Sequence, residues 1–190
     1  IWNPLVRLSH ILDVELFGLN PLGHHLQGIF WHAVNAVLAF LLLRCLTGTF
    51  WTSALGAALF AWHPLRVESV TWISERKDVV SVAFGLLAVL AYLAYARRRA
   101  AAAPAGRWYA LTLLACAAAL LSKPSMVTLP GIFLLLDFWP ASRLALGGAA
   151  AAPASNPVRP PLASLLVEKL PFALMAGILL FPGAGLHLVE

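Results

Sequence analysis

Seven ionisable side chains lie within sixteen residues of this 190-residue chain, in the segment HPLRVESVTWISERKD at positions 63–78. Arg76 and Lys77 are of the type that binds phosphate esters, because guanidinium and ammonium groups form charge-assisted hydrogen bonds with phosphate oxygens. A carboxylate beside them could accept a proton from a hydroxyl group, or it could position that hydroxyl group by accepting a hydrogen bond from it. The other ionisable residues of the segment are His63, Arg66, Glu68, Glu75 and Asp78.

The simplest alternative is that this segment is a salt-bridged hairpin at a membrane boundary. Exposed ion pairs contribute only about 0–1 kcal/mol each, and such a hairpin needs no ligand. The density of charge favours a binding site, since six of the chain's 13 basic and eight acidic residues fall in these sixteen positions. His63-Pro64 ends the apolar run before it, and Glu68 and Glu75, seven positions apart, are predicted to share one face of a short helix.

The rest of the chain is strongly apolar: 61% of its residues are hydrophobic and 11% are charged. A soluble domain has about 25% charged residues, so this composition predicts an all-α, polytopic transmembrane bundle. Cys45 and Cys116 both lie in apolar runs and do not indicate a disulfide framework. The chain opens at Ile1 without a signal peptide and ends directly after an apolar run, so we expect it to be a segment of a longer protein.

Six apolar runs predict about six membrane helices: 24–45, 50–62, 79–95, 108–122, 126–139 and 170–189. A full crossing needs about 20 residues, so the shorter runs must tilt little or recruit flanking residues, and 50–62 is the weakest. The predicted divisions are an N-terminal segment 1–21, transmembrane helices within 22–140, an Ala/Pro-rich cytoplasmic connector 141–168 and a further transmembrane helix in 169–190.

The basic residues indicate which side of the membrane each loop faces. Alternating crossings place eight Lys and Arg residues on one side and five on the other, which marks the first side as cytoplasmic. On the second side acids match the cations, and segment 63–78 lies there, facing the periplasm or lumen. The net charge of +5 then requires no nucleic acid partner, because anionic lipid of the inner leaflet balances it.

Two further segments bring polar residues to the outer side. Leucines recur at helical spacing through 5–19, so residues 1–21 are predicted to form an amphipathic helix in the membrane interface, although an ordinary loop helix fits equally well. His24 and His25 open the first span and could contact a ligand, whereas His32 and Asn35 lie deeper and are interpreted as links between helices. We predict no metal site, because no carboxylate or cysteine lies at ligand spacing on this helix.

Lys123-Pro124 falls at the outer end, between the fourth and fifth runs. A lone lysine there could simply extend to the headgroup region. The prolines at 124 and 130 interrupt regular helix and free backbone groups to line a cavity. At the other end of the fifth run, Asp137 is followed by two aromatic residues, and we interpret it as part of an interfacial belt without a chemical role.

Three separated motifs occur in order: WNPLVRLSHILDVELFGLNPLGHHLQGIFWHAVNAVL, HPLRVESVTWISERKD and LSKPSMVTLPGIFLLLDFWP. Together they resemble the membrane region of the transmembrane-and-tetratricopeptide-repeat (TMTC) proteins, over about residues 1–140. That family resembles the GT-C glycosyltransferases, multi-spanning enzymes that move a sugar from a polyprenyl-phosphate lipid to an acceptor on the outer face. In the animal members the sugar is mannose and the acceptor is a protein serine or threonine.

The resemblance implies a role for each motif in a GT-C-like bundle. The expected catalytic base lies upstream of Ile1 and tetratricopeptide repeats lie downstream, so this segment would not turn over alone. The expected donor substrate is a lipid-linked sugar, and the expected acceptor is a protein or a glycan. No cofactor is expected. The protein would reside in a bacterial inner membrane, or in the endoplasmic reticulum of a eukaryote. The resemblance implies that the phosphate of the donor is bound by Arg76, Lys77 and Lys123. The residues expected to position the substrates are His63, Glu68, Glu75, Asp78, His24 and His25.

Two other functions stay open from the sequence. A membrane anchor that displays repeats without chemistry would be favoured by an upstream loop that lacks any acidic residue. A transporter would line its path with polar residues inside the membrane. The third and last runs carry no charged residue in their central stretches, and no inverted repeat is visible, so transport is the weaker of the two.

Overall fold

The computed structural model describes residues 3–141, 143 and 160–185, and every regular element within them is a helix. Short 3-10 helices, labelled η, break the chain where it turns. The elements are α1 (Pro4–Phe17), α2 (Pro21–Thr47), α3 (Phe50–Trp62), η1 (Pro64–Arg66), α4 (Val67–Thr71), η2 (Ile73–Glu75), α5 (Arg76–Ala100), α6 (Gly106–Ser122), η3 (Pro124–Thr128), α7 (Leu129–Phe138) and α8 (Leu162–Gly185).

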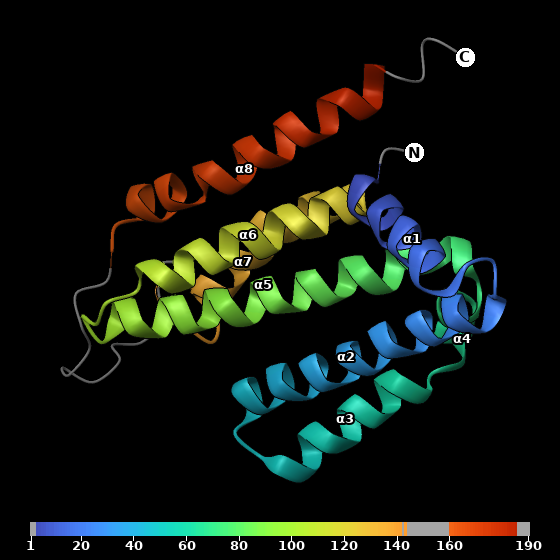
Figure 1. Ribbon diagram of the computed structural model, residues 1–190. Coiled ribbons are helices and arrows are strands. Elements are labelled where there is room, and N and C mark those ends of the chain that lie inside the picture. The colour runs from blue at the N-terminus through green and yellow to red at the C-terminus, as the bar shows by residue number, and fades with distance from the viewer. Residues whose placement is uncertain (1–2, 142, 144–159, 186–190) are drawn as a thin grey trace.

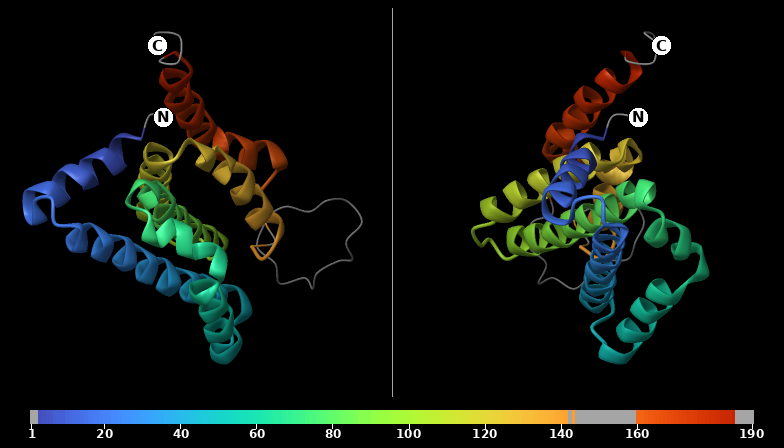
Figure 2. Two further views of the ribbon diagram at one scale, coloured as in Figure 1. Left: turned by 90° about the vertical axis from the view of Figure 1, so that its right-hand side faces the viewer. Right: turned by 45° about the vertical axis from the view of Figure 1, so that its right-hand side comes forward.

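Helices α2, α5 and α6 run side by side, and α3 folds back along α2 (Figure 1). Helix α1 crosses the end of the bundle at which α2 and α5 begin, and α8 packs against α6 and α7. Figure 2 places α2 and α7 on opposite sides of α5. Because α5 touches α2, α6 and α7, it is the central helix of the described structure.

Local sequence signals set both ends of α2. The Asn20 side chain accepts a hydrogen bond from the Leu22 backbone N–H at 3.1 Å, and Pro21 occupies the first turn, where its missing N–H costs nothing. At the other end Gly48 adopts a φ of 72°, and its N–H donates to the Arg44 carbonyl at 3.0 Å. The helix therefore extends beyond the predicted run of 24–45 at both ends.

The best-packed core lies among α5, α6, α7 and α8. The ring of Tyr92 stacks on that of Phe133 with centroids 4.7 Å apart, and the Phe172 ring meets Phe133 edge-on at 5.1 Å. All three side chains are buried. Aromatic contacts thus join α5, α7 and α8 through one stack.

Polar side chains join α2 to its neighbours, as predicted for the two deeper residues of the first span. Asn35 Nδ2 donates to the Val79 carbonyl of α5 at 2.8 Å. His32 Nε2 lies 3.0 Å from the Ala61 carbonyl of α3. The interpretation of these residues as links between helices is confirmed.

The prediction of a helical membrane protein is confirmed. Three helical segments are long and apolar enough to cross a bilayer: Pro21–Thr47, Ile73–Ala100 and Leu162–Leu179. Three further apolar helices are shorter, Phe50–Trp62, Gly106–Ser122 and Pro124–Phe138, so six complete crossings and a GT-C arrangement stay predictions.

The structure corrects the helix expected in segment 63–78. Glu68 lies in α4 and Glu75 in η2, and the two are separated by Trp72, whose backbone is extended (φ −85°, ψ 118°). They therefore do not share a helix face. Arg76, Lys77 and Asp78 form the first turn of α5, and α4 packs closely on α2. A Cβ on Gly28 would lie 2.7 Å from the Val70 carbonyl oxygen, so this approach requires glycine.

Two further boundaries differ from prediction. Helix α8 begins at Leu162, so residues 162–168 belong to it, whereas most of the predicted connector lies outside the described residues. Helix α1 has the predicted amphipathic character, with Leu8, Leu12 and Leu16 more than half exposed. Its polar side faces the bundle and carries Asp13, which is 1% exposed.

Candidate functional site at one end of the bundle

Three separated stretches of sequence meet at the end of the bundle where α2 and α5 begin, here called the patch end (Figure 1). Asp13 of α1 forms an ion pair with Arg76 at the start of α5. Lys123, which follows α6, donates to Asp78 Oδ1 at 2.6 Å. The three sequence motifs therefore contribute to one polar region, as their predicted location on one side requires.

Arg76 is committed to contacts within the protein. Its side chain is 2% exposed and is paired with Asp13, and its Nη2 donates to the His24 carbonyl at 3.0 Å. Breaking such a buried pair is costly, because the remaining charge has lost its water. The geometry favours a positioning role, in which Arg76 ties α1 and α2 to the start of α5; direct phosphate contact by this residue stays a prediction.

Lys77 and Lys123 are more accessible. Lys77 Nζ lies 2.8 Å from Glu75 Oε1, with the two side chains 22% and 27% exposed. The side chains of the Lys123–Asp78 pair are 34% and 27% exposed. Partly solvated pairs of this kind contribute only about 0–1 kcal/mol, so an incoming phosphate could replace the carboxylates at little cost.

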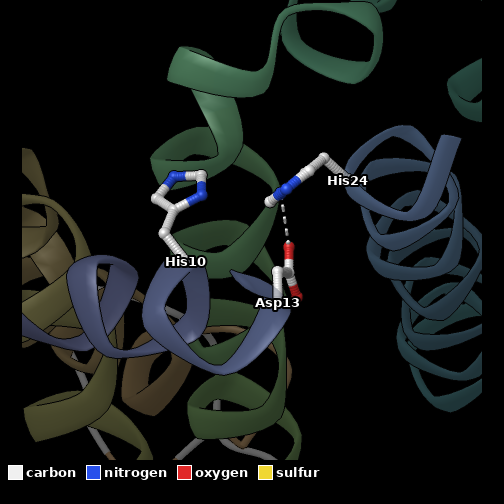
Figure 3. A group of neighbouring side chains, drawn as sticks. All are labelled: His10, Asp13 and His24. Carbon is white, nitrogen blue, oxygen red and sulfur yellow. Dashed lines mark ion pairs between the residues drawn. The ribbon is translucent and has the colours of Figure 1, made fainter. Parts of the chain in front are cut away.

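Figure 3 shows His10, Asp13 and His24 facing one another between α1 and α2. Each offers one donor atom, and these atoms lie within 4.8 Å of one another, which suits a divalent metal such as zinc. Arg76 already supplies a positive charge to Asp13, and His24 Nδ1 lies 3.3 Å from the same carboxylate. A metal would have to share that carboxylate with a guanidinium. We therefore interpret the group as an ion-pair network, and absence of a metal from the site stays a prediction.

His10 gives this network a pH dependence. Burial lowers its pKa from 6.5, the charge of Arg76 lowers it further, and Asp13 and His24 act in opposite directions. Because folding disfavours the protonated imidazole, the unfolded chain binds more protons and stability falls as the pH drops below about 6.5. We expect the protection of the α1 amides against hydrogen exchange to decrease between about pH 7.5 and about pH 5.5. In the His10→Gln variant this protection should decrease less. An equal decrease in both proteins would contradict this account.

The remaining predicted residues lie apart from this network. His63 ends α3 and accepts a hydrogen bond from the Leu65 backbone N–H through Nδ1 at 3.3 Å. It lines an open hollow of about 520 Å³ together with Leu59, Phe60, Leu65 and Arg66. Glu68 and His25 are exposed, and within the described residues no hydrogen bond or ion pair joins their side chains to the network. The structure thus gathers His24, Glu75, Arg76, Lys77, Asp78 and Lys123.

Sequence reasoning missed a second charged group, here called the core ion cluster. Asp137 is fully buried, accepts hydrogen bonds from Tyr92 Oη at 2.7 Å and Arg143 Nη1 at 3.0 Å, and pairs with Lys169. Arg143 also donates to Glu168 at 2.8 Å. The cluster joins α5, α7 and α8 at the end opposite the patch end.

The interpretation of Asp137 as an interfacial residue is therefore wrong. Helix α7 turns it inward, whereas Phe138 and Trp139 are 48% and 61% exposed. One signal could have found it: Asp137 and Glu168 are the only acids between positions 79 and 189, on a side rich in cations. Isolated acids among apolar helices are costly unless they are paired.

The chain is similar in sequence to several curated animal proteins. Protein O-mannosyl-transferase Tmtc2 of Drosophila melanogaster is 34% identical over 139 residues, which are 72% of this chain and 15% of that protein. Protein O-mannosyl-transferase TMTC2 of Mus musculus is 30% identical over 143 residues, 75% of this chain and 17% of that protein. Protein O-mannosyl-transferase TMTC3 of Homo sapiens is 33% identical over 133 residues, which are 69% of this chain and 14% of that protein.

This chain thus spans between 14% and 17% of the length of these relatives. No family model matches the chain, and no solved structure matches it.

Proposed function

This chain is homologous to a segment of the TMTC protein O-mannosyl-transferases, as its three motifs predicted, and from that premise we propose that the protein containing it is a membrane glycosyltransferase. The reaction would move a sugar, mannose by analogy with the relatives' names, from a polyprenyl-phosphate donor to a protein hydroxyl. The homology supports the reaction class. The donor, the membrane face and the GT-C mechanism are parts of the proposal.

The observation that carries the proposal is that two lysines, Lys77 and Lys123, each pair with a carboxylate at the start of α5, at the patch end. Lys123 lies 45 residues from Asp78 in sequence and yet donates to it at 2.6 Å. Two partly exposed cations beside buried Arg76 give the patch end a local site for a phosphate. Lysine is suited to bind phosphate as a point charge.

In the proposed mechanism the acceptor hydroxyl loses its proton to a carboxylate outside this chain and attacks the anomeric carbon with inversion. The bond from that carbon to the donor phosphate breaks, and the phosphate leaves with the electron pair. Lys77 and Lys123 stabilise the developing negative charge, which is the main electrostatic contribution such a site can make. Glu75 and Asp78, released from their lysines, can hold sugar hydroxyl groups.

The patch end would face the periplasm or lumen, because the arginines at 97–99 lie at the other end of α5. Membrane location itself follows from the apolar helices and the relatives. The animal relatives give no support to the predicted bacterial inner membrane, and the endoplasmic reticulum is the alternative that we predicted for a eukaryotic protein.

The test uses the full-length protein with both lysines changed, Lys77→Gln and Lys123→Gln. We expect the rate of sugar transfer from a polyprenyl-phosphate donor to fall by about 100-fold or more, because each removed charge no longer stabilises the leaving phosphate. The measurement is the transfer of mannose to an acceptor peptide, followed by mass spectrometry.

The matched control is Arg7→Gln, which removes an exposed cation from α1 at the same end without touching either pair. It should transfer at the wild-type rate. Transfer by the double-lysine variant at the wild-type rate, with normal expression, would remove the lysines from the donor site.

A further inference from the structure

Five cations lie at the patch end, and three of them have carboxylate partners: Arg76, Lys77 and Lys123. Within the part of the chain that the structure describes, Arg7 and Arg66 have no such partner. Arg7 is exposed on α1, whereas Arg66 is half-buried and lines the open hollow beside His63. A cation that faces a hollow without a counter-ion attracts an anionic ligand.

The walls of the hollow hold this cation in place. The Arg66 guanidinium carbon lies 4.5 Å from the centroid of the Phe60 ring, and the Phe60 ring in turn stacks on His32 with centroids 6.0 Å apart. Stacking on an aromatic ring leaves the edges of a guanidinium free to donate hydrogen bonds. His63 also lines the hollow, and because its Nδ1 accepts from the Leu65 backbone N–H, its Nε2–H can donate a further hydrogen bond.

An apolar stripe on α3 leads away from the hollow. Trp51, Leu55, Leu59 and Trp62 recur at spacings of four, four and three, so they lie on one face of the helix. Their exposed fractions are 81%, 64%, 63% and 84%. Leu59 belongs both to this stripe and to the hollow, so the two surfaces are continuous.

We propose that the hollow and the stripe bind a lipid whose head is a phosphate ester. Arg66 and His63 donate to the phosphate oxygens, and the apolar chain lies along Leu59, Leu55 and Trp51. The occupant is a phospholipid of the surrounding bilayer, because the stripe is exposed along α3 and the hollow is open to the surface. The site is separate from the cluster of Lys77 and Lys123, and it does not depend on the transferase activity proposed above.

Charge complementarity selects this occupant over an apolar helix. A helix packed on α3 would bury Trp62 and Leu59 but would leave the Arg66 charge partly desolvated without a partner, which is unfavourable. A lipid phosphate satisfies the guanidinium and covers the apolar stripe in one molecule. The hollow is also open to the surface, so a lipid can enter it.

The test is native mass spectrometry of the full-length protein in a non-ionic detergent, titrated separately with farnesyl phosphate, phosphatidylglycerol and farnesol. We expect Arg66→Gln to weaken binding of phosphatidylglycerol by about ten-fold or more, as the loss of charge-assisted hydrogen bonds predicts. Arg66→Lys should keep part of the affinity. Arg7→Gln, which changes the net charge equally, should bind as the wild type does.

The probes also identify the lipid. Binding of phosphatidylglycerol at least as tight as that of farnesyl phosphate would support the proposal. Failure of the wild type to bind phosphatidylglycerol, unchanged binding of it by Arg66→Gln, an equal loss in Arg7→Gln, a preference for farnesyl phosphate, or binding of farnesol as tight as that of phosphatidylglycerol would overturn it.

Discussion

Replacing Asp137 with alanine should lower the free energy of unfolding by about 3–5 kcal/mol. Its carboxylate is buried and balances half of the positive charge of the core ion cluster. Without it, Arg143 and Lys169 share one acid, Glu168, and a buried positive charge is left uncompensated. Tyr92 also loses the nearer acceptor of its hydroxyl and keeps only Glu168 Oε1, at 3.3 Å. The measurement is denaturant unfolding of the purified protein in detergent micelles.

A double variant separates charge imbalance from loss of packing. Asp137→Asn with Lys169→Met removes one charge of each sign, and it should recover most of the stability lost in Asp137→Asn alone, because neutral replacements of a buried ion pair are often tolerated. An Asp137→Ala protein within about 0.5 kcal/mol of the wild type would show that the cluster contributes nothing to the stability of the bundle.

Replacing Asp13 with alanine should release α1 from the bundle. Arg76 is 2% exposed, and with Asp13 gone its side chain retains only the His24 carbonyl as a hydrogen-bond acceptor within the described structure. Breaking a buried pair by removing one partner costs about 3–5 kcal/mol. We expect amide hydrogen exchange, measured by mass spectrometry, to increase throughout Pro4–Phe17 and in the first turn of α5.

The same helix supplies a matched control for this change. Glu15 is two residues away from Asp13, is exposed and forms no ion pair within the described residues. The Glu15→Ala variant should therefore show the same amide hydrogen exchange as the wild type. Asp13→Asn with Arg76→Met should exchange less than Asp13→Ala, since it leaves no unpaired charge. Wild-type protection in Asp13→Ala would mean that α1 is held by its apolar contacts alone.

Most helix positions could be predicted because local signals determine them. The run at 50–62 coincides with α3, since Gly48 precedes it and Pro64 follows it and each disfavours continuation of a helix. The run at 108–122 likewise lies within α6. Length, apolar composition and helix breakers are readable from neighbouring residues, so no tertiary information was needed.

The partners of the charged residues could not be predicted, because they lie far apart in sequence. The leucine spacing of α1 placed Asp13 off the apolar stripe, but it could not show that Arg76, 63 positions later, would bury it. For the same reason Arg76 resembled a free phosphate ligand in the sequence. The break at Trp72 was missed because the residues around it have no proline or glycine to signal it.

The core ion cluster has a consequence for biogenesis. Asp137 and Arg143 are six positions apart and in contact at 3.0 Å, and the neighbours Glu168 and Lys169 are in contact at 2.9 Å. Each half is therefore electrically neutral before the other has been synthesised. An unpaired charge costs about 2.5–3.5 kcal/mol at the centre of an inserting helix and less toward its ends. Glu168 and Lys169 lie in the first half of α8, so this helix enters the bilayer with its own counter-ion. When it docks, Arg143 also pairs with Glu168 and Lys169 also pairs with Asp137, while both original pairs stay in contact, so docking brings no net charge.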